Sequence, residues 1–321
     1  MSLREKTPPN VVILGAGFIG LSLAAAFRDA GFIVDLVEPD MARRAAAPEG
    51  IRLQEKAIAL AGLSRDGNGS LTYFGKALPA VGHAALVLEC GPEDLAVKQA
   101  IFADLLRHAP PGAVLATASS AIPISRILPD PTAQARCLVA HPVNPPAVLR
   151  LIELAPGPGT SAQTVSRCAE LFRDGGFTPV TLGHEVEGFV LNRLQGAVLR
   201  EAYRLVEEGV TDVEGIDTVM RLGLGPRWAL SGPFETAELN TAGGIRAHAA
   251  RLGPAYKRMG EARGETVEWS DALVTQVEAQ RRVVCPADQL AARAAWRSEA
   301  VARLVALRDT LMGKRDGTND A

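Results

Sequence analysis

"NVVILGAGFIGLSLAAAFRDAGFIVDLVEPD", residues 10–40, decides the fold of this chain. A short apolar run at residues 11–14 is followed by a glycine-rich turn, by an apolar helical pattern that ends at Gly31, and by a second apolar run at residues 33–37. Short apolar runs bounded by turns are typical of buried strands, and a glycine after a helical pattern is typical of a helix end. The stretch therefore predicts one strand–helix–strand unit with parallel strands.

The turn inside this unit carries the pattern GxGxxG. Between a strand and a helix, Gly15 permits the tight turn, Gly17 lets the backbone approach a pyrophosphate, and Gly20 lets the helix pack closely on the strand. The first helical residues, Phe18 and Ile19, would then present backbone N–H groups to the phosphates. The turn predicts a dinucleotide site, and a glycine turn that binds no nucleotide is the alternative.

The end of the second strand bears on the choice of cofactor. Glu38 is placed to accept hydrogen bonds from the adenosine ribose, and its charge would repel a 2′-phosphate. This favours NAD. Arg43 and Arg44 follow closely and keep NADP open, because arginine is the residue type that accommodates the extra phosphate.

The rest of the chain predicts two domains. Apolar runs alternate with helical patterns as far as "FTPVTLG", which indicates an α/β fold: a Rossmann-type, doubly wound and mostly parallel sheet covered on both faces. From residue 188 onward only helical periodicity is found, with Phe189, Leu194, Val198 and Tyr203 on one face. We expect an NAD-binding domain at residues 1–187 and an all-α domain at residues 188–321, whose last eight residues form a frayed tail.

The composition is that of a folded protein with a small-molecule partner. The 321 residues exceed what one core usually organises, and 47% of them are apolar and 22% charged. With a formal net charge of -2 and no long cluster of lysine and arginine, no nucleic-acid partner is expected.

Cysteines and leader-like features bear on the compartment. The four cysteines match no zinc-ligand spacing, so we expect reduced thiols, no metal site and a cytoplasmic protein; they are Cys90, Cys137, Cys168 and Cys285. Residues 11–27, preceded by Arg4 and Lys6, resemble the start of a secretory signal. The glycines fall where a nucleotide-binding turn needs them and the run is short for a membrane span, so we expect neither a signal nor a membrane anchor.

A histidine and a glutamate in apolar surroundings are the candidate catalytic pair. His141 follows the apolar run "CLVA" and begins "HPVNPP", at the carboxyl end of a predicted strand, where open α/β sheets bind ligands. Glu153 lies within the apolar run "LRLIELA", where a carboxylate needs a partner. A carboxylate that accepts the Nδ1 proton would leave Nε2 of His141 free to take a hydroxyl proton. A hydrogen-bonded structural histidine is the alternative.

Several motifs together resemble a known family. "HPVNPP" with Glu153, "SS" at Ser119 and Ser120, and "GFVLNRL" at residues 188–194 are similar to the L-3-hydroxyacyl-CoA dehydrogenase family. "LVEEGV", "VMRLGLGPRWALSGPFET" and "LAARAAWRSEAVARLVALR" resemble its λ-crystallin branch, whose enzymatic identity is L-gulonate 3-dehydrogenase. The resemblance runs from about residue 10 to 312, with the motifs of both halves in the expected order.

The resemblance implies a role for each matching residue. His141 is the general base, Glu153 is the carboxylate that orients it, and Ser119 hydrogen-bonds the 3-oxygen of the substrate. Asn192 reaches into the same site, and Asn144 supports the histidine segment and the substrate. These groups suit hydride transfer, which needs a base and oxygen-binding donors around one carbinol carbon.

Two further residues match positions near the nicotinamide end of the cofactor. They are Glu93 and Lys98, in "PEDLAVK". Taken alone, both are equally consistent with surface charges. Ser119 taken alone is also consistent with a helix N-cap, and Asn192 with a solvated helix position.

The substrate is predicted from the lack of a basic helical hairpin and from the position of one arginine. Acyl-CoA members of the family carry a long basic helical hairpin after the second strand, whereas residues 39–82 here are short and rich in alanine and glycine. Arg227, beside Trp228, is expected to bind a substrate carboxylate as a bidentate partner, with a surface or interface ion pair as the alternative. We therefore expect NAD-dependent oxidation of the 3-hydroxyl of a small, L-gulonate-like L-3-hydroxy acid.

Two other functions stay open at this point. One is an L-3-hydroxyacyl-CoA dehydrogenase of fatty-acid metabolism. The other is a non-catalytic crystallin-like or NAD-sensing protein. The apolar helical faces of the second domain exceed what one short bundle needs, so we also expect a homodimer formed through that domain.

Overall fold

The computed structural model describes residues 8–264 and 270–293, together with residues 296 and 307. Backbone contacts divide the chain into two compact units, Met1–Val198 and Leu199–Ala321. The predicted boundary between residues 187 and 188 stays a prediction. The described residues contain no helix that is both long enough and apolar enough to cross a bilayer.

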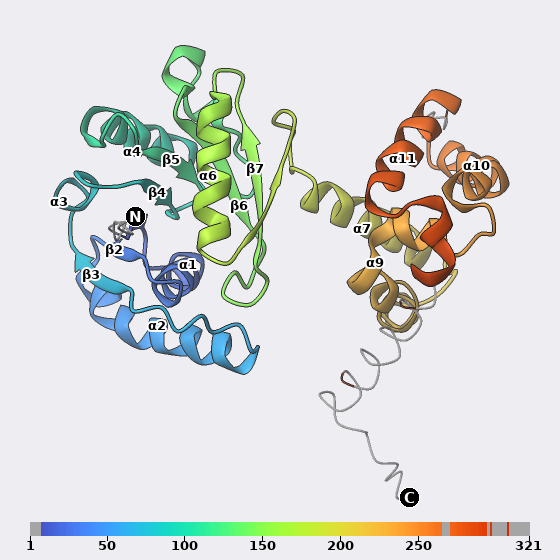
Figure 1. The fold of residues 1–321 in the computed structure, drawn as a ribbon, viewed down its shortest axis with the longest axis horizontal. Helices are drawn as coiled ribbons and strands as arrows, with labels where there is room; N and C mark the ends of the chain where they lie inside the picture. The colour runs from blue at the N-terminus through green and yellow to red at the C-terminus, as the bar shows by residue number, and fades with distance from the viewer. Residues whose placement is uncertain (1–7, 265–269, 294–295, 297–306, 308–321) are drawn as a thin grey trace, which may run out of the picture. The chain divides into compact units, whose positions relative to one another are not determined.

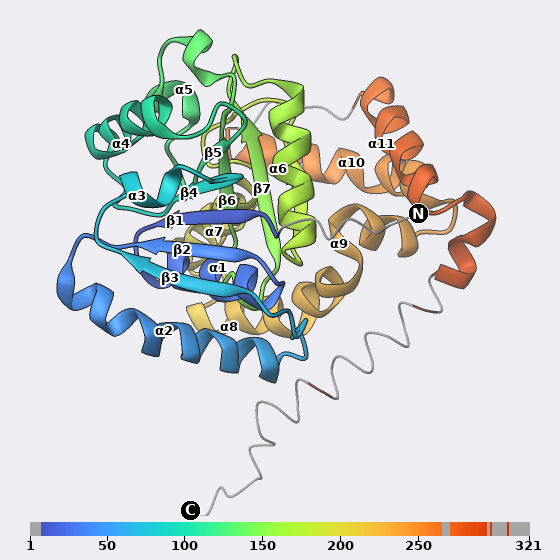
Figure 2. The same cartoon turned by 60° about the vertical axis from the view of Figure 1, so that its left-hand side comes forward.

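The N-terminal unit is built on one eight-stranded sheet with the order β3-β2-β1-β4-β5-β6-β7-β8 (Figure 1). The strands are β1 (Asn10–Leu14), β2 (Ile33–Val37), β3 (Ser70–Phe74), β4 (Leu86–Glu89), β5 (Val114–Thr117), β6 (Cys137–Pro142), β7 (Leu151–Pro156) and β8 (Thr178–Thr181). Strands β6 and β7 are antiparallel, and every other neighbouring pair is parallel. Figure 2 shows β1, β2 and β3 side by side.

Helices cover both faces of this sheet. They are α1 (Phe18–Asp29), α2 (Met41–Leu60), α3 (Leu78–Val81), α4 (Leu95–His108), α5 (Ile124–Ile127) and α6 (Ala162–Asp174), with a 3₁₀ turn, η1, at Pro131–Gln134. Alternate residues of β1 enter two separate apolar cores, as a strand buried on both faces requires. One core contains Phe27 of α1 and Phe172 of α6, and the other contains Phe102 of α4. The predicted doubly wound fold is confirmed.

Register aligns the carboxyl ends of the central strands. Leu14 of β1 lies opposite Val37 of β2 and Glu89 of β4, and Glu89 lies opposite Thr117 of β5. The chain turns that follow these residues therefore meet at one edge of the sheet, which is where ligands bind in folds of this class.

The described part of the C-terminal unit is helical, as predicted. Its elements are the end of α7 (Leu191–Glu207), α8 (Val213–Val219), a π-helical segment η2 (Met220–Leu224), α9 (Gly225–Leu239), α10 (Gly244–Ala262), α11 (Asp271–Val284) and the 3₁₀ turn η3 (Ala287–Gln289). Buried carboxylates hold α11 to α9: Glu238 pairs with Arg281 at 3.1 Å and with Arg282. Most of the terminal stretch "LAARAAWRSEAVARLVALR" and the predicted tail lie outside the described residues.

One prediction about α7 is wrong. Phe189 is not on the apolar face of the helix, because α7 begins only at Leu191 and Phe189 lies in the turn before it. Its side chain is fully buried in the core of the N-terminal unit, whereas Leu194 and Tyr203 of α7 are exposed. The backbone leaves the helical conformation here because Gly188 and Phe189 both adopt positive φ, +77° and +50°.

Candidate active site

The structure pairs the two predicted catalytic residues across the antiparallel strands β6 and β7. His141 and Glu153 lie directly opposite each other in the register. Nδ1 of His141 is 2.8 Å from Oε2 of Glu153, and both side chains are buried. A carboxylate can only accept, so Nδ1 donates, and in the neutral form of the ring Nε2 carries the lone pair. None of the described residues forms a hydrogen bond with Nε2, which leaves it available to accept a proton.

The other oxygen of Glu153 is bound by backbone at the start of α7. Oε1 accepts hydrogen bonds from the backbone N–H groups of Val190, at 2.9 Å, and Leu191, at 3.0 Å. The first N–H groups of a helix have no partner within the helix, and they favour an anion. This contact was not predicted from the sequence. The glycine before α7, Gly188, was the one available signal, since it indicates a sharp turn into the helix.

A buried ion pair lies at the carboxyl end of β4. Nζ of Lys98 is 2.8 Å from Oε2 and 3.1 Å from Oε1 of Glu89, and neither side chain reaches solvent. The carboxylate of Glu89 also accepts from Oγ1 of Thr117 and from the backbone N–H of Gly91, each at 2.7 Å. Lys98 is therefore not a surface charge. Glu89 was missed, although an acid at the end of the apolar run "LVLE" is the same signal that identified Glu153.

This cluster continues to Glu93 and Ser119. Oγ of Ser119 donates to Oε1 of Glu93 at 2.5 Å, and Oε2 of Glu93 lies 3.4 Å from Nζ of Lys98. Burial raises the pKa of Glu93, but the hydrogen bond from Ser119, the charge of Lys98 and the N–H of Ala121 outweigh burial and hold that pKa below its usual range. Oγ of Ser119 also accepts from the N–H of Ile122 at 2.7 Å, so the N-cap-like contact is present as well.

The two asparagines differ in their surroundings. Nδ2 of Asn192 donates to the backbone carbonyl of Ser120 at 3.0 Å, which places this amide beside the Ser119 segment. The side chain of Asn144 is exposed and has no hydrogen bond among the described residues. The predicted support of the histidine segment by Asn144 stays a prediction.

The glycine turn has the shape that a dinucleotide needs. Gly15 has φ +111°, and a Cβ there would lie 2.8 Å from the carbonyl oxygen of Cys90; a Cβ on Gly20 would lie 2.0 Å from the carbonyl oxygen of Gly15. A Cβ on Gly17 would meet nothing within 4 Å, so this position faces open space. Helix α1 begins at Phe18 with no side-chain cap, and its first N–H groups, through Ile19, are not bound by a capping side chain.

A cavity of about 500 Å³ extends from this turn along the ends of β1, β2 and β4. Its lining includes Gly17, Glu38 and Arg43. Glu38 is buried, and its carboxylate accepts from the backbone N–H groups of Ala16 and Asp40 at 2.9 Å each. Arg44 is turned to the main chain, donating to the carbonyl of Glu38 at 2.6 Å. The turn, the uncapped helix and this acid together fit NAD, and Arg43 is the arginine left at the cavity.

Arg227 lies in the C-terminal unit. Its Nε donates to the carbonyl of Gly223 at 3.0 Å, and its side chain lines a mainly apolar cavity of about 660 Å³ together with Trp228, His248 and Tyr256. The predicted contact with a substrate carboxylate stays a prediction.

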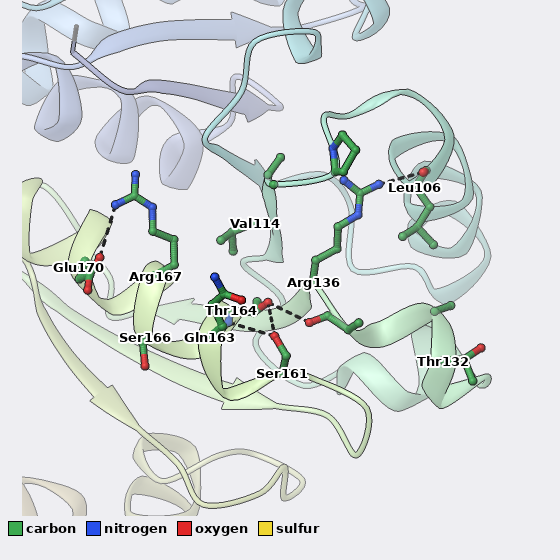
Figure 3. A pocket seen from close by; sticks show the side chains of 15 residues that line it. Leu106, Val114, Thr132, Arg136, Ser161, Gln163, Thr164, Ser166, Arg167 and Glu170 are labelled. Carbon is green, nitrogen blue, oxygen red and sulfur yellow. Dashed lines mark hydrogen bonds and ion pairs between the residues drawn. The ribbon is translucent and has the colours of Figure 1, made fainter. Parts of the chain in front are cut away.

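A further cavity of the N-terminal unit lies at the opposite edge of the sheet (Figure 3). It measures about 770 Å³ and is lined by residues at the amino ends of β5 and β6 and by the first turns of α6. Its polar groups bind protein atoms: Arg136 donates to the carbonyls of Leu106 and Ala109, and Thr164 to that of Ala135. Ligands of such sheets bind at the carboxyl ends, so this cavity is not the candidate site.

Comparisons with known proteins show the family to which the chain belongs. The model of the 3-hydroxyacyl-CoA dehydrogenase NAD binding domain matches residues 10–186, and that of the 3-hydroxyacyl-CoA dehydrogenase C-terminal domain matches residues 188–282. A lambda-crystallin homolog of Bos taurus is 39% identical over 315 residues, covering 96% of this chain and 98% of the relative. An L-carnitine dehydrogenase of Mesorhizobium japonicum is 31% identical over 272 residues, covering 83% of this chain and 74% of the relative.

A solved structure shows the same fold over most of the chain. The NAD⁺-dependent 5-formyl-3-hydroxy-2-methylpyridine 4-carboxylic acid 5-dehydrogenase superimposes with a TM-score of 0.69 at 27% identity, covering 95% of this chain and 99% of the other. Two family models in order and relatives aligned over almost the full length confirm the resemblance and the cofactor. The chain belongs to the 3-hydroxyacyl-CoA dehydrogenase family and is an NAD-dependent oxidoreductase.

Proposed function

We propose that this protein oxidises the 3-hydroxyl of a small, L-gulonate-like L-3-hydroxy acid to the 3-oxo acid. The observation that carries the proposal is the buried pair of His141 and Glu153 at the carboxyl edge of the sheet, with no described residue bound to Nε2 of the imidazole. An imidazole with one nitrogen fixed and the other free to accept a proton suits alcohol oxidation.

A contact supports each proposed role. His141 takes the proton of the 3-hydroxyl at Nε2, and Glu153 keeps Nδ1 protonated and stabilises the imidazolium that forms. NAD, when bound, supplies the acceptor for the hydride. Ser119 now donates its only hydroxyl proton to Glu93, so polarising the 3-oxygen requires that proton to turn to the substrate. Asn192 uses one amide proton on Ser120 and keeps a second for the same oxygen.

The proposed contacts lie toward the adenosine and the nicotinamide ends of the cofactor. The glycine turn binds the pyrophosphate, Glu38 binds the adenosine ribose, and Glu93 and Lys98 lie toward the nicotinamide. The proposed pyrophosphate site comprises Gly15, Gly17, Phe18, Ile19 and Gly20. It is supported by the open space at Gly17 and by the uncapped start of α1.

A free acid is favoured over a CoA thioester. One relative is named L-carnitine dehydrogenase, and carnitine is a free 3-hydroxy acid. The span after β2 folds as the single helix α2 and is followed by β3, so it forms no helical hairpin. We propose Arg227 as the partner of the substrate carboxylate. L-3-Hydroxyacyl-CoA oxidation is the second candidate, and the names of both matching family models favour it.

A substrate panel tests these alternatives. The full chain is incubated with NAD and with L-gulonate, L-carnitine, L-3-hydroxybutyrate or L-3-hydroxybutyryl-CoA, and the absorbance of reduced cofactor is followed, with His141→Gln as the blank. Turnover of a free acid supports the proposal. Turnover of the thioester alone supports the second candidate. Silence across the panel, with NAD still bound in a calorimetric titration, supports a crystallin-like or NAD-sensing protein.

We also propose a homodimer and a cytoplasmic setting. In the C-terminal unit α8 and η2 bury no residue, and Val213, Val219 and Leu222 are exposed, which supports a face covered by a second copy. All four cysteines are free thiols, which supports a reducing compartment. Light scattering of the full chain tests the first of these proposals.

A further inference from the structure

A strained residue lies beside the paired imidazole. Phe189 has φ +50°, in the left-handed region that bulky side chains rarely adopt. Its side chain is fully buried, and its ring centroid lies 5.3 Å from that of His141 at an interplanar angle of 42°. Strain of this kind persists only where the surrounding structure imposes it, and it is concentrated at functional sites.

The same residue belongs to the turn that binds Glu153. The N–H of Phe189 donates to the carbonyl of Val186 at 3.0 Å, and the next two N–H groups, of Val190 and Leu191, donate to Oε1 of Glu153. The chain reaches this arrangement through two consecutive positive φ angles, at Gly188 and Phe189. Without them, α7 would extend toward its N-terminus, and these N–H groups would point to backbone carbonyls.

We propose that Phe189 is a positioning residue for the pair of His141 and Glu153. Its ring packs against the imidazole, and its left-handed backbone directs two N–H groups to the carboxylate. One residue thereby restricts the rotation of the base and fixes the anion that holds its tautomer. Glycine would adopt this φ without strain, but it has no ring to hold the imidazole. The inference concerns His141 as a base and so rests on the proposed function.

Three variants remove the ring, and one of them also relieves the backbone strain. Phe189→Leu keeps an apolar side chain and removes the flat ring, Phe189→Met does so with an unbranched chain in case the leucine variant fails to fold, and Phe189→Gly relieves the strain and removes the ring. Phe102→Leu is the matched control, because Phe102 is a fully buried phenylalanine of the same apolar core on α4.

The kinetic expectation is a loss in kcat alone. With a substrate identified by the panel, Phe189→Leu and Phe189→Gly lower kcat about tenfold, as expected when a base is less well placed, while the Kd of NAD is unchanged. Phe102→Leu keeps kcat near wild type even if its Tm falls as far as that of Phe189→Leu. Equal kcat in Phe189→Leu and wild type would overturn the proposal.

A second readout needs no substrate and so separates this proposal from the proposed function. In the wild type, Nδ1–H of His141 gives a low-field NMR signal that disappears in Glu153→Gln, and the amides of Val190 and Leu191 exchange slowly. In Phe189→Leu the signal is broadened and both amides exchange at least about tenfold faster, whereas Phe102→Leu matches wild type. Unchanged signal and exchange refute the positioning role even if the protein turns over none of the panel.

Discussion

Nζ of Lys98 lies 2.8 Å from Oε2 of Glu89, and both side chains are excluded from solvent. A buried ammonium group is tolerated only with a counter-charge, so this pair stabilises the loop at Gly91 and the strand end at Thr117 only while both members are present. Lys98 also approaches Glu93, so the two predicted cofactor residues lie close together.

Removal of one charge of this pair destabilises the protein. We expect Glu89→Gln to lower the free energy of unfolding by about 3–5 kcal/mol, because Lys98 is left buried with only the more distant Glu93. The double variant Glu89→Gln/Lys98→Met recovers most of that loss, and Thr117→Val costs only about 1 kcal/mol. Urea denaturation measures all three. A single variant as stable as the double one would contradict the interpretation.

Replacing His141 or Glu153 with glutamine tests their proposed roles. We expect His141→Gln and Glu153→Gln to lower kcat about 10²–10⁴-fold, because the first removes the proton acceptor and the second removes the charge that stabilises the imidazolium. Steady-state kinetics gives kcat, and calorimetry gives an unchanged Kd for NAD. His184→Gln is the control on a histidine outside the pair. A Glu153→Gln enzyme of near wild-type rate refutes its proposed role.

Selectivity between NAD and NADP is predicted to depend on Glu38 and Arg43. Replacing Glu38 with Ala removes the charge that repels a 2′-phosphate and leaves Arg43 at the cavity, so the ratio of kcat/KM for NADP to that for NAD rises at least about tenfold. Adding Arg43→Ala cancels the gain. Adding Arg44→Ala does not, because Arg44 is bound to main-chain carbonyls. Equal effects of the two arginines would exclude this explanation.

Acid is expected to weaken the contact between Ser119 and Glu93. Because the pKa of Glu93 is lower in the folded protein than its ordinary 4.5, this stabilisation is complete above about pH 5 and is lost as the pH falls through the folded value. Ser119→Ala should lower Tm by about 2–4 °C at pH 7, and the difference from wild type should shrink below pH 4.5. Ser120→Ala is the control. A Tm difference that does not change with pH contradicts the prediction.

Replacing Arg227 with Met tests the proposed carboxylate contact. The loss of a bidentate ion pair should raise KM for a free hydroxy acid at least about tenfold, with KM for NAD unchanged. Arg221→Met, on the same segment but paired with Glu214, is the control. If the kinetics of Arg227→Met are those of the wild type, Arg227 has no role in substrate binding.

The sequence by itself determined the architecture and the pairing of His141 with Glu153. Strands, helices and the glycine turn are local features, since periodicity and glycine placement act over a few residues. Glu153 could be recognised because a carboxylate in an apolar run needs a partner, and the histidine at the end of a neighbouring strand was the obvious one. The family resemblance then supplied Glu93, Lys98, Ser119 and Asn192.

Only the tertiary structure decided how these side chains are held. Glu89 meets Lys98 and Thr117 because parallel strands β4 and β5 end in register. Glu153 meets the N–H groups of Val190 and Leu191, which lie 37 and 38 positions further along the chain. The sequence pattern placed Phe189 on a helix, whereas the fold holds it in a left-handed turn against His141. Such contacts join residues far apart in the chain, and long-range packing overrides the local preference for helix.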